Sequence, residues 1–398
     1  MNALERDRRV VRVDDEHSLH GAIKLVSRVL GNDYGDDLRR HALDPSYRIQ
    51  NTFLVILGGE VVSHLRLVPR EMRIGRSLLR VAIVADLVTA PEHEGHGHAR
   101  TALDAALEAA RGERYHLALL FSEINNFFQD LGWTQWCRPT FTFDIHADSV
   151  VDVPDCVRAY KSSDFGPMMA IHGFFGSSYS GPLLRSIAWW KADLQRYVDG
   201  GDVLVVDNQG TITGYARVRH NWPNEGDSTI TDLLAMNQVD ECGLMSAVTG
   251  RAVHHGSVRI IGSGPLTSRL EDLIPSNQEP CVIGEDLRTM LKVVNLRRLI
   301  RNLVPEFEAI GFRGNGCRDE SINIAVGNMA AEISCNGGRF DVKAPSSEQP
   351  SFLQLTERDF FHLLFEGIVP AAGSVSNSDW IRAIFPKREF AFWGGDEV

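Results

Sequence analysis

The stretch APEHEGHGHARTALDAALEAAR, from Ala90 to Arg111, decides the fold of the first third of the chain. From Ala99 onward, alanines and leucines recur at steps of three and four, which predicts an amphipathic helix. Gly95 and Gly97 come just before this helix, among three histidines. A helix start presents unsatisfied N–H groups and a partial positive charge, so glycines that let the backbone approach closely there predict a cradle for a phosphate.

The segments on both sides of this stretch predict a mixed α+β domain. Residues 51–90 read as a strand, a Gly-Gly turn, a second strand and then two more, because aliphatic runs alternate with turn residues. After the helix, residues 115–123 (YHLALLFSE) predict a buried strand, residues 125–132 a short helix, and residues 140–145 a final alternating strand. The glycine loop therefore joins a strand to a helix.

The middle of the chain resembles the first part. FLVILGGEVVSHLRLV (53–68) aligns with VLVVDNQGTITGYARV (203–218) as strand, turn and strand. A gapless alignment from Asp86 and Asp232 then places Gly97 opposite Gly243 and Gly95 opposite Glu241. We expect a second copy of the fold that has lost the loop; the alternative is that two unrelated αβ segments look alike at this level.

Other functions of the glycine loop are disfavoured. No G-K-[ST] follows, which excludes a Walker loop, and the third glycine of a Rossmann fingerprint is absent because Thr101 and Ala102 stand in its place. His93, His96 and His98 raise the alternative of a metal site. Only Glu92 and Glu94 are available nearby as further ligands, so we expect solvated loop histidines and no metal.

The last third changes character. Residues 291–312 predict a strand leading into a helix, residues 321–344 a meander, and residues 355–367 a helix capped by Thr356. The end, IFPKREFAFWGGDEV (384–398), is aromatic, whereas disordered termini are usually polar. We therefore expect the C-terminus to be packed.

Composition limits the classes of function. The net charge is −11, which argues against binding a nucleic-acid backbone and favours a cationic partner. No run approaches a membrane span, and the first residues lack the apolar region of a secretory signal, so we expect a cytoplasmic protein without membrane contact.

Two motifs resemble the GNAT acetyltransferases. Glu94 to Ala99 follow the pattern [QR]-x-x-G-x-[GA] of motif A, with a glutamate where a cation or amide is usual. NNFFQDLGW resembles the next motif through Phe128, Gly132 and Trp133. The resemblance implies acetyl-CoA as cosubstrate and no metal. It also implies that the strand residues Leu87, Val88 and Thr89 offer backbone amides to the cofactor, with Asn126 added from the short helix.

Over its whole length the chain resembles the enhanced-intracellular-survival family of aminoglycoside-acetylating enzymes. Further marks are YSGPLLRS (179–186), the pair Trp189 and Trp190, and the terminal WGGDEV. The resemblance implies a catalytic GNAT domain at 1–148, a second GNAT-like domain without the CoA loop at 149–285, and a sterol-carrier-like α/β domain at 286–398. Relatives assemble into trimers or hexamers, so a homo-oligomer is expected.

The resemblance also assigns catalytic groups. In the family, a tyrosine protonates the departing thiolate, but the matching residue is Phe128, which has no proton to give. Ser122 or a water then takes this role, or the step proceeds with little acid catalysis, since a thiol pKa near about 8.5 already makes a fair leaving group. The family places its terminal carboxylate at the active site as the base, a role that falls to Val398.

The substrate class follows less directly. Asp396, Glu397 and Glu123 are expected to attract a cationic amine. An aminoglycoside is the first choice, and a kasugamycin-like compound is one specific amino-sugar candidate. The alternatives are acetylation of protein lysines or of another metabolite amine, and a non-catalytic acyl-CoA-binding protein.

Overall fold

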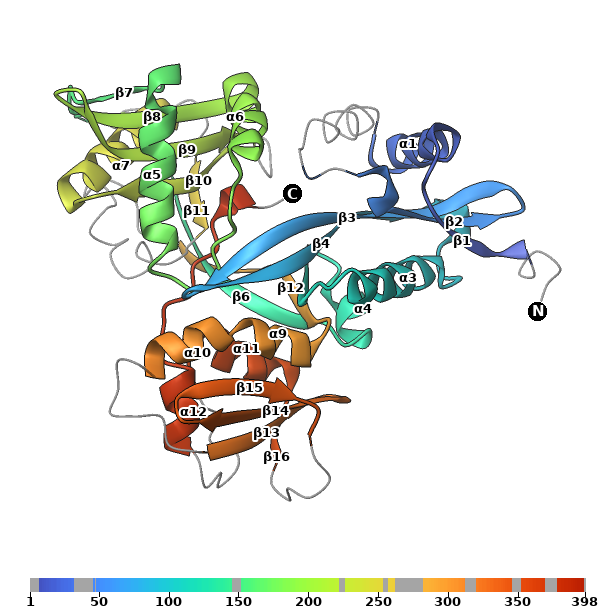
Figure 1. Cartoon of the computed structure of the whole chain (residues 1–398). Coiled ribbons are helices and arrows are strands. Elements are labelled where there is room, and N and C mark those ends of the chain that lie inside the picture. Colours follow the sequence, from blue (N-terminus) through green and yellow to red (C-terminus); the bar gives the residue numbers. More distant parts are fainter. Residues whose placement is uncertain are drawn as a thin grey trace.

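In the computed structural model, three lobes meet around one long sheet (Figure 1). The structure describes residues 7–31, 46, 48–144, 152–221, 226–252, 257–261, 282–311, 320–345, 352–368 and 378–396. Within those ranges, every helix is too short or too polar to span a bilayer.

The first lobe is a strand meander followed by a helix and a parallel strand. Its elements are β1 (Arg9–Arg12), α1 (Glu16–Leu30), β2 (Thr52–Leu57), β3 (Glu60–Ile74), β4 (Ser77–Thr89), α3 (His98–Gly112), β5 (Leu117–Phe121) and α4 (Asn125–Asp130). Gly58 and Gly59 turn β2 into β3 with φ of +57° and +86°, a region that favours glycine. Alanines and leucines of α3 pack on β2–β5 to form the core of this lobe.

One prediction for the first lobe was wrong in detail. Four strands were expected from residues 51–90, but three are present, because β3 runs without a break through Pro69. The pairing of β3 with β4 continues on both sides of this proline, from Val68 opposite Ile83 to Arg70 opposite Val81.

The second lobe repeats the strand order of the first, with two helices before its meander where the described part of the first lobe has one. It contains β7 (Val157–Ala159), α5 (Phe165–Gly176), α6 (Ile187–Gly200), β8 (Gly201–Asn208), β9 (Thr211–His220), β10 (Asp227–Ala235), α7 (Gln238–Ala252) and β11 (Ser257–Ile261). β8, β9 and β10 form an antiparallel meander like β2–β4, and α7 then leads to β11, which pairs with β10 in parallel. The expected internal repeat is therefore present as a repeat of topology.

Two long strands join the lobes. β6 (Thr134–Asp144) and β12 (Val282–Val293) lie between β5 and β11, so the twelve strands form one sheet in the order β1-β2-β3-β4-β5-β12-β6-β11-β10-β9-β8-β7. β12 comes from late in the chain but pairs with both β5 and β6. The first lobe is therefore completed by a strand that directly precedes the third.

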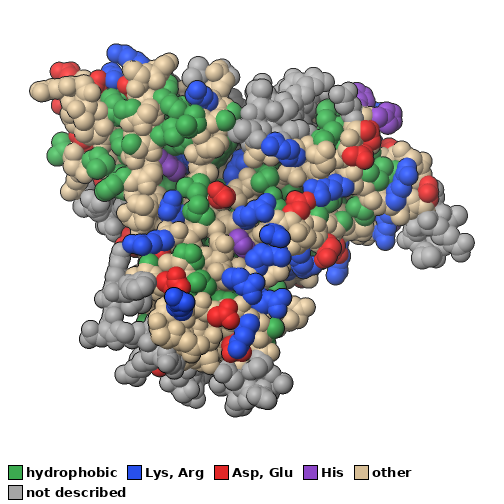
Figure 2. Space-filling view, viewed as in Figure 1, with side chains coloured by type: hydrophobic (Ala, Val, Ile, Leu, Met, Phe, Trp, Pro, Cys, Tyr) green, Lys and Arg blue, Asp and Glu red, His purple; other side chains and the backbone are tan. Residues whose placement is uncertain are grey.

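The third lobe is a four-stranded sheet with helices. Its elements are α9 (Leu296–Asn302), α10 (Val304–Gly311), β13 (Glu320–Val326), β14 (Met329–Asn336), β15 (Arg339–Lys343), β16 (Phe352–Leu355), α11 (Glu357–Glu366) and α12 (Ser378–Ile384). Thr356 caps α11, as predicted, by accepting a hydrogen bond from the Asp359 amide at 3.1 Å. Where the first and third lobes meet, Lys and Arg side chains gather on the surface (Figure 2), and Arg298 donates to the Arg111 carbonyl.

Candidate active site

The first lobe contains two parallel strands that separate. β4 and β5 pair from Val81 opposite Leu117 to Val84 opposite Leu120. β4 continues to Thr89, yet within the described ranges no further pair joins it to β5. Beyond Val84, β4 therefore extends past its pairing with β5, and a wedge opens between the two strands.

Three residues expected to contact the cofactor lie on the part of β4 beyond its pairing with β5. Leu87, Val88 and Thr89 form the end of β4, with Val88 buried and the other two half-buried. On the opposite side, Val88 and Thr89 pair with β3 through His64 and Ser63. That pairing holds the end of β4 in place, and the Ser63 hydroxyl also donates to the Val88 carbonyl at 2.8 Å.

The glycine loop leads from the end of β4 to α3. Gly95 and Gly97 have φ of +75° and +77°, and Gly97 is the residue that caps α3. A side chain added at either glycine would meet no atom within 4 Å, so the space beside the helix start is open. The first turn of α3 has no acidic residue. This geometry fits an anion held by backbone N–H groups.

The other residues of the loop frame this opening. Glu94 and His96 are exposed, and the His96 ring contacts the Glu94 carbonyl through Nδ1 at 2.8 Å. His98 is 5% exposed, Ala99 is half-buried, and the His96 and His98 rings stack with centroids 6.2 Å apart. Among the described residues, no group of three or more His, Cys, Asp or Glu side chains is placed to hold a metal ion.

The residues expected to act at the thiolate follow β5. The Ser122 hydroxyl accepts a hydrogen bond from the Ile124 amide at 3.0 Å, and the Ser122 side chain is half-buried. Glu123 and Asn126 are exposed. Phe128 is 6% exposed and packs edge-on against Trp133 in the core of the first lobe.

A buried ion pair marks the point where the strands separate, and sequence reasoning did not assign it to the site. Arg66 on β3 donates to Asp86 on β4 at 2.9 Å, and both side chains are 3% exposed. Asp86 has φ +55° and lies two residues beyond the last β4–β5 pair. The one available sequence signal was the alignment of Asp86 with Asp232, which suggested that the repeat retains an aspartate at this place.

The C-terminal segment is packed, as expected, and passes the mouth of the wedge. Phe390 contacts Trp136 of β6, and Phe392 lies 5.7 Å from the ring of Phe121, the last residue of β5. Arg138 lies over both Phe121 and Phe392. Trp393 is 1% exposed and belongs to the core of the second lobe. The segment thus runs from the third lobe, beside the end of β5, into the second lobe.

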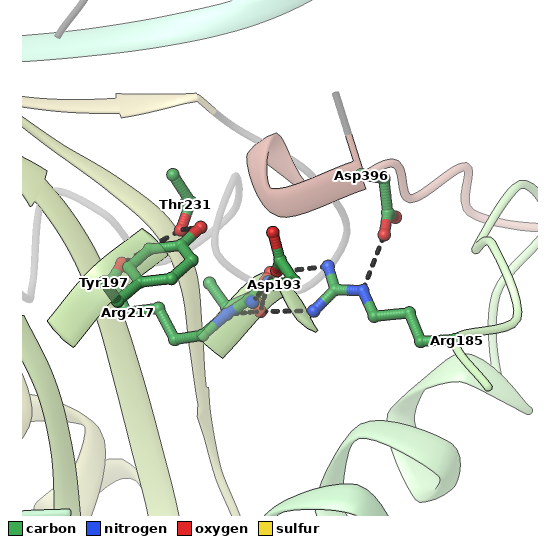
Figure 3. A network of polar contacts seen from close by, with 7 residues as sticks. Arg185, Asp193, Tyr197, Arg217, Thr231 and Asp396 are labelled. Carbon is green, nitrogen blue, oxygen red and sulfur yellow. Dashed lines mark hydrogen bonds and ion pairs between the residues drawn. The ribbon is translucent and has the colours of Figure 1, made fainter. Parts of the chain in front are cut away.

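The described chain ends in a buried charge network (Figure 3). Asp396 closes the short helical turn η6 (Gly394–Asp396), and its Oδ1 accepts from Arg185 Nε at 2.7 Å. Arg185 also donates two hydrogen bonds to Asp232, at 2.6 and 3.0 Å. Burial raises the pKa of Asp396 to about 6 despite the ion pair with Arg185, whereas the cations Arg185 and Arg217 lower that of buried Asp232 to about 2. Asp396, expected at the substrate, instead lies fully buried in this network. Glu397 and Val398 lie outside the described residues.

The second lobe lacks the cradle for a physical reason. Eight residues connect β4 to α3, but two connect β10 to α7. Gly243 therefore lies inside α7, whereas Gly97 precedes α3, so the gapless alignment of these two glycines was wrong. The first turn of α7 carries buried Asp240 and Glu241, and such acidic side chains oppose an anion there.

A separate cavity of about 330 Å³ lies between the first and second lobes. Arg70, Glu71 and Arg80 line it from β3 and β4, and Ser186 and Trp189 line it from the second lobe. Arg80 lies near the start of β4, so this cavity is some distance from the end of that strand, where the wedge opens.

Comparisons with known proteins agree with this geometry. Residues 10–136 match the family model described as an acetyltransferase (GNAT) domain. No curated protein sequence matches the chain. A GCN5-related N-acetyltransferase from Kribbella flavida is 17% identical with a TM-score of 0.68, and 98% of each chain is covered. Eis1 from Mycobacterium abscessus is 15% identical with a TM-score of 0.64, covering 98% of this chain and 100% of that one. A GCN5-related N-acetyltransferase from Anabaena variabilis is 15% identical with a TM-score of 0.65, covering 97% and 98%.

The separating strands, the glycine loop and the family match together define a GNAT acetyltransferase domain in the first lobe. The complete chain has the fold of Eis1, including the repeated lobe and the C-terminal α/β lobe. The expected fold class is therefore confirmed, as is the resemblance of the first lobe to the GNAT acetyltransferases.

Proposed function

We propose that the chain is an acetyl-CoA-dependent N-acetyltransferase that acts on an amino group of a cationic small molecule. The observation that carries this proposal is the wedge between β4 and β5, with an open helix start at its end. A thioester lying in the wedge and a pyrophosphate at the helix start require these two features, placed in succession along one strand.

The cofactor is proposed to bind mainly through backbone. Leu87, Val88 and Thr89 pair with the pantetheine arm and polarise the thioester carbonyl, and Glu94 to Ala99 hold the pyrophosphate through their amides. Asn126 is exposed on α4 and completes this set from the β5 side. Glu94 is exposed and negatively charged where the family usually has a cation or an amide, so we assign the attraction for the phosphates to the backbone amides at the helix start.

The acceptor amine must lose a proton before it attacks, and we propose the Val398 carboxylate as the base. The path of the C-terminal segment supports this, since Phe392 contacts the end of β5 and the described chain stops two residues before Val398. Glu397 and exposed Glu123 are proposed to attract the cation. For Asp396 we replace the substrate role with an anchoring role.

The departing thiolate needs a proton or must leave as an anion. Phe128 occupies the family's acid position, and its ring is packed in the core. Ser122 or a water is therefore the proposed donor. We expect general-acid catalysis to contribute at most about a hundredfold, the low end of its usual range.

For the substrate we propose an aminoglycoside, possessing several amines, in line with the family resemblance and the net charge of −11. The domain limits 1–148, 149–285 and 286–398, a homo-oligomer of three or six chains and a cytoplasmic location complete the proposal.

The test is to incubate the protein with acetyl-CoA and a panel of amines and to measure turnover by the release of the CoA thiol. Release with aminoglycosides, including kasugamycin, supports the proposal. Release with lysine peptides or metabolite amines alone would show another acceptor class. Acetyl-CoA binding without release for any amine would show a binding protein and overturn the enzymatic function.

Truncation tests the base. A chain lacking Glu397 and Val398 keeps the Asp396 anchor but moves the terminal carboxylate two residues back. We expect kcat to fall by about a hundredfold, within the usual range for a lost general base, while calorimetry shows unchanged acetyl-CoA affinity. Full turnover in this variant would contradict the role of Val398.

A further inference from the structure

The two lobes have equivalent places where the described pairing of two parallel strands ends. β10 and β11 pair from Asp227 opposite Ser257 to Ile230 opposite Ile260, and β10 then continues to Ala235, paired with β9 but with no further β11 partner among the described residues. Asp232 lies two residues beyond the last pair, as Asp86 does in the first lobe. Each aspartate binds an arginine of the preceding strand, Arg217 for Asp232 and Arg66 for Asp86. Asp232 therefore marks the second lobe's counterpart of the acetyl-transfer wedge.

The chain's own C-terminal segment lies against this second wedge. The turn η6 contacts β10, and Gly395 lies so close to the guanidinium of Arg217 that a side chain there would collide with it. Trp393 packs against His172 of α5 with ring centroids 4.6 Å apart. In the first lobe we assign the place beside the equivalent aspartate to a cofactor, whereas in the second lobe η6 lies there.

The contact is chemically specific. Arg185 uses its Nε for Asp396 and its other two nitrogens for Asp232, and all three side chains are 0% exposed. A guanidinium is suited to this because its planar donors bind two carboxylates in fixed directions. The second Asp396 oxygen has no hydrogen-bond partner within the described part of the chain. Burying the Asp396 carboxylate without the Arg185 cation would cost free energy, so the two side chains are expected to depend on each other.

The YSGPLLRS stretch, which had no function from sequence, holds the segment from its other side. Ala391 N donates to Ser180 O at 2.8 Å, and Ser180 N donates to Glu389 O at 3.0 Å. Gly181 has φ +105°, and a side chain there would collide with Phe390. Two residues later, Leu183 bridges to Met72 of β3. This stretch therefore contacts both the C-terminal segment and the first lobe.

We propose that the second lobe has exchanged the acyl-CoA position of its wedge for a docking site that takes the chain's own C-terminal segment, with Arg185 as the positioning residue for Asp396. The docking fixes the position of Asp396, the last described residue. Its consequence for acetyl transfer rests on the proposed function, because that function assigns the base to Val398.

The test compares full-length chains carrying Asp396→Asn or Arg185→Lys with a control, Glu389→Gln. Asn has the shape of Asp without its charge, and Lys keeps the positive charge of Arg without the planar guanidinium donors. Glu389 serves for the control because it is an exposed carboxylate of the same segment. Carboxypeptidase release of Val398 and Glu397, followed by mass spectrometry, reports docking without reference to activity. Steady-state kcat and acetyl-CoA affinity are measured in parallel.

We expect at least tenfold faster release in Asp396→Asn, a smaller increase in Arg185→Lys and no change in the control. The kcat should fall at least tenfold in Asp396→Asn with acetyl-CoA affinity unchanged. Equal release in Asp396→Asn and the wild type would overturn the docking site, even if the amine panel confirms acetyl transfer. Faster release with unchanged kcat would overturn the positioning role.

A measurement on the unaltered chain covers the case in which these variants do not fold. Hydrogen exchange should show the amides of Ala391 and Asp396 protected, because they donate to Ser180 O and Trp393 O. Exchange of residues 391–396 at the rate of a free peptide would overturn the proposal.

Discussion

Gly97 is the residue on which cofactor binding depends most. Its φ of +77° lets the backbone turn into α3, and open space surrounds its Cα. A side chain at this position costs about 1–2 kcal/mol from the backbone conformation, but it meets no clash within the protein. The effect of a new side chain's size and charge on ligand binding can therefore be separated from its effect on the stability of the fold.

Gly97→Glu should weaken acetyl-CoA binding at least tenfold, because a bulky anion then projects into the space proposed for the pyrophosphate. Gly97→Ala is the control, since it carries the same backbone strain without charge and with little bulk. Isothermal calorimetry at fixed salt compares them. If both variants bind like the wild type, the cradle is not at this helix start.

His116 predicts a pH dependence of stability. Burial, with the cations Arg298 and Arg80, lowers its pKa from 6.5 to about 4, and its Nδ1 accepts from the Arg80 amide at 2.8 Å. Because the pKa in the folded state lies below the unfolded value, this contribution is complete above pH 6.5 and is lost as pH falls toward 4. The loss amounts to about 3 kcal/mol at most.

The measurement is urea unfolding between pH 7 and 4. His116→Asn should flatten the decline in unfolding free energy over that range, while exposed His20→Asn should leave it unchanged. Asp396, whose pKa is raised to about 6, acts with the opposite sign between pH 4 and 6, so the comparison with wild type is needed to isolate His116. An identical pH profile for His116→Asn and wild type refutes this assignment.

At the scale of elements, α3 and α7 hold the same place in two lobes but differ at their first turns. α3 follows Gly95 and Gly97 and has no acidic residue in its first turn. α7 starts two residues after β10, and its first turn contains the buried side chains of Asp240 and Glu241. Asp240 also accepts hydrogen bonds from Asn237 and Thr213, so its carboxylate is held in place. One helix start can hold an anion and the other already contains one.

We therefore expect one acetyl-CoA per chain. Calorimetric titration should give a stoichiometry near one, and Asp240→Asn should leave both stoichiometry and affinity unchanged. Two sites per chain in the wild type would show that the second lobe has retained a cofactor site.

Many of the individual helices and turns could be predicted from sequence, because they depend on local patterns. The repeating alanines and leucines of α3, the Gly-Gly turn after β2 and the Thr356 cap act within a few residues. The alignment of α3 with α7 could not be predicted, because a gapless alignment cannot show that the loops before these helices differ by six residues. The Arg185–Asp396 pair joins residues 211 apart in sequence, and no local pattern marks it.

At the scale of the whole molecule, the sheet is built from strands that are distant in sequence. β12 pairs with β5 from Thr289 opposite Phe121 to Val293 opposite Leu117, and with β6 on its other side. The largest hydrophobic core includes strands of the first lobe and helices of the third. The GNAT lobe is therefore not complete without residues beyond 281.

A fragment of residues 1–281 should accordingly fail to fold cooperatively. It lacks β12, so both β5 and β6 lose a strand partner, and the apolar face covered by α9 becomes exposed. Circular dichroism during heating should show a broad transition instead of the sharp one of the full chain. A sharp transition with intact acetyl-CoA binding in the fragment contradicts this interdependence.

The central claim is that main-chain groups at the junction of β4 and α3 hold acetyl-CoA. A crystal structure of the chain with acetyl-CoA tests it most directly. The account predicts the pyrophosphate at the amides of residues 95–99 and the thioester between β4 and β5, beside Asp86. Cofactor bound in the second lobe, in the cavity beside Trp189 or nowhere on the chain would contradict it.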